Sequence, residues 1–89
     1  MLTERDKELI IQFARKYDVS QIYLFGSSMK EGIKSKDIDL GVKGLRPELF
    51  FKFYGELSRK VSKNVDLVDL SQNSLFTQLI EKRGIKIYG

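Results

Sequence analysis

Three aspartates and a Gly-Ser pair are the residues of this sequence whose types and spacing could do chemistry. Asp37 and Asp39 lie two positions apart in a segment, Asp37 to Val42, that alternates between polar and apolar residues. Side chains alternate across a β-strand, so both carboxylates should point to one face and the apolar residues to the other. Two carboxylates so close repel unless a positive charge lies between them. Because hard oxygen ligands suit magnesium, the pair predicts a Mg²⁺ site.

A later apolar strand, predicted from Asn64 to Leu70, offers a third carboxylate. Asp66 and Asp69 have opposite parity in it, so only one of them can face the first pair. We assign the role to Asp66, which has apolar residues on both sides, whereas Asp69 lies beside a polar loop. Three carboxylates around two cations about 3.5–4 Å apart form the arrangement used in phosphoryl-type transfer. Asp66 would bind the metal ion at the acceptor hydroxyl and could also serve as base.

The Gly-Ser pair, Gly26-Ser27, follows an apolar strand predicted from Ile22 to Phe25. Glycine lets the backbone approach an anion closely, and serine offers a hydroxyl and an amide to phosphate oxygens. Three lysines follow in the loop and could help to hold a triphosphate, namely Lys30, Lys34 and Lys36.

Each of these features also has a plain structural interpretation. A Gly-Ser pair after a strand is most often a turn, and the loop lysines are individually typical of a solvated loop. Asp37 alone could be a strand-start carboxylate, and Asp66 alone could be a strand-edge charge facing water. Asp39 is harder to explain in this way, because an unpaired carboxylate inside a strand is costly. The combination in this order therefore favours a nucleotide-binding site.

The elements that must position these residues alternate along the chain. Thr3 and Asp6 predict a capped first helix, whose apolar face is formed by Ile10, Phe13, Ala14 and Tyr17. A second helix is predicted from Pro47 to Lys60. Its apolar stripe indicates either a deeply seated helix or, for Phe51 on its flank, an interface with another chain.

A last helix is predicted after a cap at Ser71 or Asn73. Its apolar face should contain Leu75, Phe76, Leu79 and Ile80, and Gly84 should lie just past its end. A short strand, Ile85 to Tyr88, completes an order of helix, strand, weak helical turn (Met29 to Gly32), strand, helix, strand, helix and strand. This order predicts an α/β or α+β fold, a small mixed sheet with helices packed on it.

The composition bounds the function. A chain of 89 residues predicts a single domain, residues 1–89. The sequence has no cysteine and no histidine, which excludes Ser-His-Asp and Cys-His catalysis as well as zinc-thiolate and zinc-histidine sites. We see no secretory segment and no membrane-spanning run, so we expect a cytoplasmic protein without a membrane partner. A net charge of +4 permits an anionic ligand, but the aromatic residues lie on helical stripes rather than among basic residues, which disfavours a nucleic-acid partner.

The pattern as a whole resembles the nucleotidyltransferase superfamily that includes DNA polymerase β, and most closely its minimal nucleotidyltransferase (MNT) family. The resemblance covers nearly the whole chain, from the strand ending in Gly-Ser through Asp-x-Asp to the last strand. It implies the nucleotidyltransferase fold, and in that family the Gly-Ser pair contacts the nucleotide phosphates and the carboxylates hold two Mg²⁺ ions. Lys30 is the nearest counterpart of an arginine that often follows the Gly-Ser pair. The site residues implied are Gly26, Ser27, Lys30, Asp37, Asp39 and Asp66.

Members of the MNT family are commonly encoded beside a helical HEPN partner, and some transfer AMP from ATP to a tyrosine of that toxin. The resemblance therefore implies a Mg²⁺-dependent antitoxin that adenylylates its partner and releases pyrophosphate. The alternative is a non-catalytic subunit that neutralises or complements a HEPN partner by occlusion. The nucleotide base, the acceptor residue and the oligomeric state, a homo-oligomer included, stay open.

Overall fold

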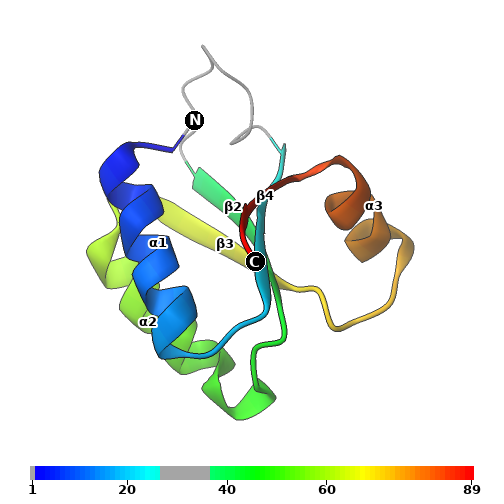
Figure 1. The fold of residues 1–89 in the computed structure, drawn as a ribbon, viewed down its shortest axis with the longest axis horizontal. Helices are drawn as coiled ribbons and strands as arrows, with labels where there is room; N and C mark the ends of the chain where they lie inside the picture. Colours follow the sequence, from blue (N-terminus) through cyan, green and yellow to red (C-terminus); the bar gives the residue numbers. More distant parts are fainter. Residues whose placement is uncertain (1, 27–36) are drawn as a thin grey trace.

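The computed structural model describes residues 2–26 and 37–89. The predicted helical turn between Met29 and Gly32 lies outside this range. Within it, the predicted alternation of helices and strands is confirmed (Figure 1). The elements are α1 (Glu4–Lys16), β1 (Gln21–Leu24), β2 (Asp37–Lys43), the 3₁₀ helix η2 (Pro47–Leu49), α2 (Phe50–Lys60), β3 (Asn64–Asp69), α3 (Leu75–Arg83) and β4 (Ile85–Tyr88).

The four strands form one mixed sheet in the order β3-β2-β1-β4. β2 and β3 run parallel, and β1 is antiparallel to both β2 and β4. Helices α1 and α2 lie together on one face of this sheet, and α3 lies on the other (Figure 1). The predicted mixed α/β architecture is therefore confirmed, and the sheet separates a core layer from a second, more thinly covered layer.

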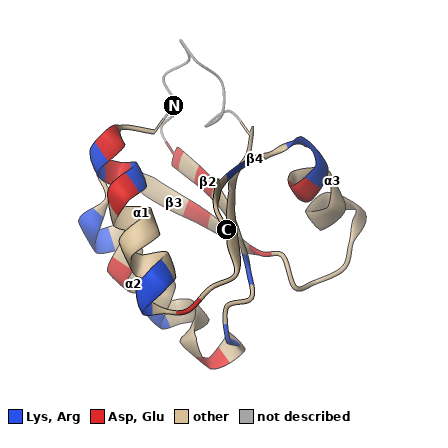
Figure 2. Cartoon of the chain, viewed as in Figure 1, with Lys and Arg blue, Asp and Glu red and all other residues tan. Residues whose placement is uncertain are grey.

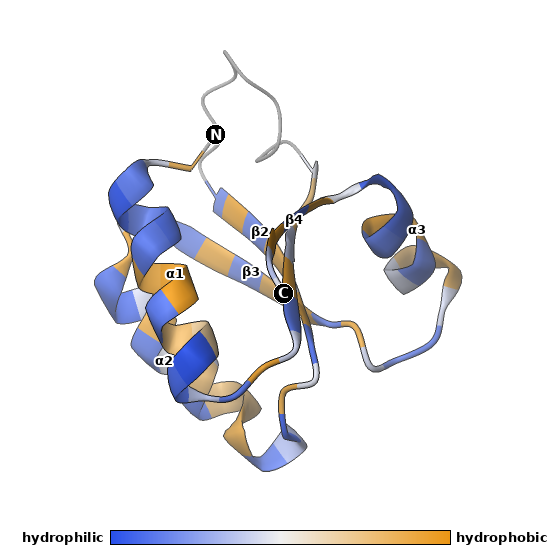
Figure 3. Ribbon diagram, in the orientation of Figure 1, coloured by the Kyte–Doolittle hydropathy of each residue, from blue (hydrophilic) through white to orange (hydrophobic). Residues whose placement is uncertain are grey.

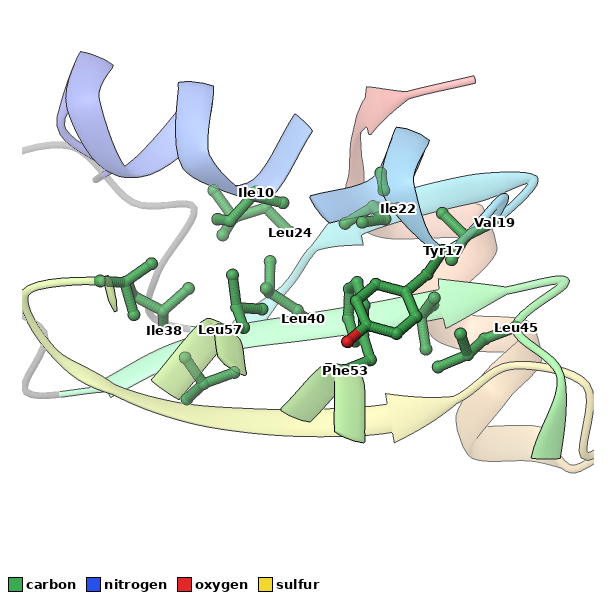
Figure 4. Close-up of a cluster of buried hydrophobic side chains, with 14 residues drawn as sticks. Ile10, Tyr17, Val19, Ile22, Leu24, Ile38, Leu40, Leu45, Phe53 and Leu57 are labelled. Atoms are coloured by element: carbon green, nitrogen blue, oxygen red, sulfur yellow. The ribbon is translucent and has the colours of Figure 1, made fainter. Parts of the chain in front are cut away.

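The core lies between the sheet and the first two helices. Side chains of α1 and α2 meet the apolar face of β1 and β2 there, with Ile10, Ile22, Leu40 and Phe53 fully buried (Figure 4). Burial of this apolar surface is the main stabilising contribution to the fold. β2 and β3 alternate between hydrophobic and hydrophilic residues along their length (Figure 3), which is the pattern of strands with one core face.

A polar cluster joins the two core helices at their outer side. The Tyr17 ring packs edge-on against Phe53, with the ring centroids 5.4 Å apart. The Tyr17 hydroxyl donates to Glu56 at 2.6 Å, and the Lys16 ammonium donates to the other Glu56 oxygen at 2.9 Å. Burial, and then the hydrogen bond to Glu56, raises the pKa of Tyr17 to about 12. The same Tyr17 bond, and then that of Lys16, lowers the pKa of Glu56.

The predicted cap of α1 is half confirmed. The Thr3 hydroxyl accepts a hydrogen bond from the Asp6 amide at 3.1 Å, as an N-cap should. The Asp6 carboxylate instead accepts from the amide and the hydroxyl of Ser62, at 3.2 and 2.6 Å. Asp6 is only 3 % exposed, and burying a carboxylate is costly unless it is hydrogen-bonded. The two bonds from Ser62 offset this cost, and they connect the start of α1 to the turn before β3.

The last helix differs from its prediction in two respects. Its N-cap is Ser74, which forms a capping box with Thr77, rather than Ser71 or Asn73. Only Thr77 and Ile80 of α3 are buried, whereas Leu75, Phe76 and Leu79 are 80, 53 and 47 % exposed. The prediction that Gly84 lies just past the end of the helix is confirmed, and its backbone there is extended, with φ −71°.

Close packing against Gly84 explains the glycine there: a Cβ atom at this position would lie 2.5 Å from the Ile80 carbonyl oxygen. Most of the apolar stripe of α3 lies outside the core. Within residues 2–26 and 37–89, no helix combines the length and the apolar character needed to cross a membrane.

Candidate active site

The acidic residues of β2 and β3 meet across the parallel pair. Asp39 is the direct register partner of Asp66, and Asp37 is the partner of Asn64. Neighbouring strands lie about 4.8 Å apart, and paired positions of a parallel ladder point to the same face. Asp69 is paired with the core residue Val42, and its carboxylate accepts from the Ser71 amide at 2.9 Å. The structure thus places Asp66, and not Asp69, on the face that carries Asp37 and Asp39.

This face of β2 has an acidic half and a packed half. Its alternate positions are Asp37, Asp39, Gly41 and Lys43. A Cβ atom at Gly41 would lie 3.1 Å from Ile80, so the glycine allows α3 to approach the sheet. The Lys43 ammonium donates to Glu81 of α3 at 2.6 Å, and this hydrogen bond raises the pKa of Lys43.

Helix α3 therefore covers one half of the face and leaves the acidic half to β2 and β3. Figure 2 shows acidic residues on these two adjacent strands. Asp66 is exposed, so the outer strand of the acidic half is accessible to another molecule.

Gly26 brings the end of β1 against Asp39. The Phe25 amide donates to the Asp39 carbonyl at 3.0 Å, which extends the pairing of β1 and β2 up to the glycine. Gly26 has φ +65°, and a Cβ atom there would lie 2.7 Å from the Asp39 carboxylate. Only glycine satisfies both conditions without strain. The remaining predicted phosphate contacts, Ser27 and Lys30, lie outside the described residues, as do Lys34 and Lys36.

The donors on this face fit magnesium in kind. Asp39 and Asp66 present carboxylate oxygens from neighbouring strands, and Mg²⁺ is commonly held by one or two carboxylates together with substrate phosphates. In residues 2–26 and 37–89, no three acidic, histidine or cysteine side chains are grouped closely enough to hold one metal ion. Asp37 lies one pleat further along β2, beside Asn64. The structure therefore brings together Asp39, Asp66 and Gly26, with Asp37 at the margin.

A pocket of about 180 Å³ adjoins these residues, and the sequence did not reveal it. Our prediction placed Phe76 and Leu79 on the apolar face of the last helix, and their spacing is that of an ordinary helix face. Nothing in the sequence separates a core stripe from a pocket wall. The lining is formed by Phe25, Gly26, Phe76, Leu79, Ile80, Arg83 and Gly84.

The family profile "Polymerase beta, Nucleotidyltransferase" matches residues 8–89. The chain therefore belongs to the polymerase β-type nucleotidyltransferase family. A search among curated proteins found no match to this sequence.

Solved structures of toxin–antitoxin complexes are similar to this chain. The crystal structure of the toxin–antitoxin MntA-HepT gives a TM-score of 0.73 at 27 % identity, over 98 % of this chain and 73 % of that one. A toxin–antitoxin structure with AMP-PNP gives 0.75 at 29 % identity, over 93 % and 73 %. The tri-AMPylated HEPN toxin of Shewanella oneidensis in complex with its MNT antitoxin gives 0.72 at 28 % identity, over 94 % and 70 %.

Proposed function

We propose that this chain is a Mg²⁺-dependent nucleotidyltransferase that transfers AMP from ATP to a HEPN-type partner protein and acts as its antitoxin. The observation that carries the proposal is the register of Asp39 with Asp66, beside the backbone of Gly26. This pairing supports a site that holds cations between a triphosphate and an acceptor. The similar complexes with AMP-PNP and with a tri-AMPylated HEPN toxin support the nucleotide and the partner.

In this proposal Asp37, Asp39 and Asp66 hold two Mg²⁺ ions, and Gly26, Ser27 and Lys30 hold the triphosphate. When bound, the ions lower the pKa of the attacking hydroxyl and neutralise charge on the triphosphate. The acceptor oxygen forms a bond to the α-phosphorus, and the bond from that phosphorus to pyrophosphate breaks. Asp66, which is exposed on the outer strand β3, faces the incoming acceptor and takes its proton.

AMP transfer can be tested with matched aspartate variants. The purified protein is incubated with Mg²⁺, ATP labelled at the α-phosphate and a lysate of its source cells. We expect the wild type and Asp69→Asn to label a protein band, and Asp39→Ala and Asp66→Asn to leave it unlabelled. Asp69 is the matched control because it lies on the same strand as Asp66 but faces the core side. Equal labelling by wild type and Asp39→Ala would refute the proposed activity.

Neutralisation of the partner by occlusion is a second candidate, favoured by the surface of α2. Phe51 is 83 % exposed, so the deeply seated interpretation of this stripe is wrong for Phe51, although Phe53 and Leu57 of the same helix are fully buried. A large exposed aromatic side chain is typical of an interface. Occlusion predicts that Asp39→Ala still protects cells from the partner whereas Phe51→Glu does not. Catalysis predicts that Asp39→Ala fails to protect.

A further inference from the structure

The pocket beside Gly26 is chemically distinct from the acidic half of the sheet. Among the described residues that line it, Arg83 is the only one with a charged or polar side chain. The other walls are aromatic and aliphatic side chains and the backbones of two glycines. Phe25 and Phe76 meet edge to face there, with the ring centroids 5.8 Å apart and the planes at 83°. A pocket of this kind selects a flat apolar group rather than a phosphate or a metal ion.

The volume of the pocket limits what can enter it. About 180 Å³ is far below the roughly 300–1,000 Å³ of a site that encloses a whole drug-sized ligand. It is slightly more than the cavity of about 150 Å³ that binds one benzene molecule in an engineered protein core. The pocket therefore has room for one aromatic ring system, and the rest of the ligand must lie outside it.

The position of the pocket connects it to the acidic residues. Gly26 lines the pocket and also lies against the Asp39 carboxylate. Ile80 lines the pocket too and packs on Gly41, which follows Asp39 on the same face of β2. Gly26 thus lies between the pocket and the Asp39 carboxylate. A ligand whose charged end lies at Asp39 and Asp66 can therefore place its other end in the pocket.

We propose that this pocket binds the base of the nucleotide, with the Phe76 ring as the stacking surface and Arg83 at the rim. The proposal rests on the proposed function, because it takes the triphosphate to lie at Gly26 and the carboxylates. Phe76 is 53 % exposed, so a large part of its surface is accessible to a ligand. Stacking on an aromatic ring is tolerant of base identity, since every base presents a π face.

Weak base selectivity follows from this lining. The guanidinium of Arg83 is a donor without acceptor capacity, so no described side chain of the pocket can accept a hydrogen bond from the amino group of adenine. Apolar pockets discriminate between similar groups by about 10- to 200-fold, whereas pockets that hydrogen-bond the ligand reach about 10⁴-fold or more. We therefore expect ATP and GTP to bind with affinities less than about 200-fold apart.

The experiment compares ATP with inorganic triphosphate, which has the phosphates but no base. Each is titrated calorimetrically, with Mg²⁺, into the wild type, Phe76→Leu and Leu75→Ala. Phe76→Leu keeps an apolar side chain against Phe25 but removes the ring. We expect it to weaken ATP binding by about 5- to 150-fold, the range for loss of one base–aromatic stack, and to leave triphosphate binding unchanged. Leu75 is 80 % exposed on the same helix and outside the pocket, so Leu75→Ala should match the wild type.

The other outcomes separate this proposal from the proposed function. If the wild type binds ATP and folded Phe76→Leu binds it equally well, the pocket does not hold the base, but the nucleotidyltransferase assignment stands. Parallel weakening of ATP and triphosphate would also overturn the proposal, since Phe76 would then act on the whole site. A preference for ATP over GTP of 10⁴-fold would overturn it as well. A wild type that binds neither ATP nor GTP would overturn both proposals.

Discussion

Replacing Gly26 with alanine should separate the geometry of the candidate active site from the stability of the fold. Gly26 has φ +65°, and an alanine Cβ would lie 2.7 Å from an Asp39 carboxylate oxygen. The left-handed backbone alone costs a non-glycine residue about 1–2 kcal/mol. In a domain of this size each kcal/mol lowers the melting temperature by about 4–8 °C, so we expect a loss of about 4–16 °C. Displacing the Asp39 carboxylate should reduce the proposed AMP transfer by about 10²-fold, a loss that a 1 Å misplacement can cause.

Gly44→Ala is the matched control for this substitution. Gly44 also has a positive φ, +80°, and a Cβ there would meet the Ser20 side chain, at the end of β2 far from Asp37. Both variants should have a lower melting temperature than the wild type, measured by circular dichroism during thermal unfolding. At a temperature where both variants are folded, only Gly26→Ala should lose AMP transfer. Full transfer by folded Gly26→Ala would refute the inferred contact with Asp39. Equal loss in both variants would show that stability, not site geometry, limits the activity.

Two further predictions concern the polar contacts that hold the core helices. Asp6→Ala should lower the free energy of unfolding, measured with urea, by about 1.5–3 kcal/mol, because it removes the hydrogen bonds that Ser62 donates to the Asp6 carboxylate. A loss below about 0.5 kcal/mol would contradict that reasoning. Tyr17 has a pKa of about 12, raised from 10.0, so its stabilising contribution is complete below pH 10 and lost as the pH rises from about 10 to 12. The stability difference between wild type and Tyr17→Phe should therefore shift in favour of the variant across this range and stay constant between pH 7 and 9.

The arrangement of the acidic residues could largely be predicted from the sequence, because it depends on the alternation of side chains along a strand. Alternation along a strand places Asp37 with Asp39 and separates Asp66 from Asp69 without any knowledge of the fold. The structure adds the register of the parallel pair, which sets Asp39 opposite Asp66 and Asp37 opposite Asn64. Register follows from how two distant segments pack, and local spacing does not determine it.

The details of α3 could not be predicted in the same way. Ser74 lies three residues before a threonine rather than a glutamate, so its capping box has an unusual second member. The apolar spacing of Leu75, Phe76 and Leu79 is compatible with either a core face or a pocket wall. In the structure Ile80 packs on Gly41, whereas Phe76 and Leu79 line the pocket. The exposure of Phe51 likewise depends on where η2 ends and α2 begins, and the sequence alone does not determine this boundary.

The small buried area of α3 affects the local unfolding of the molecule. Elements with little apolar burial undergo local unfolding most readily. Helix α3 buries only Thr77 and Ile80, whereas α2 buries the larger apolar side chains of Phe53 and Leu57, so α3 loses less apolar burial on opening. Its backbone amides should exchange hydrogen for deuterium faster than those of the core helices. A ligand in the pocket would slow this exchange, since it could bind only after the helix is ordered. Nucleotide occupancy would then set the rigidity of α3 on this side of the sheet.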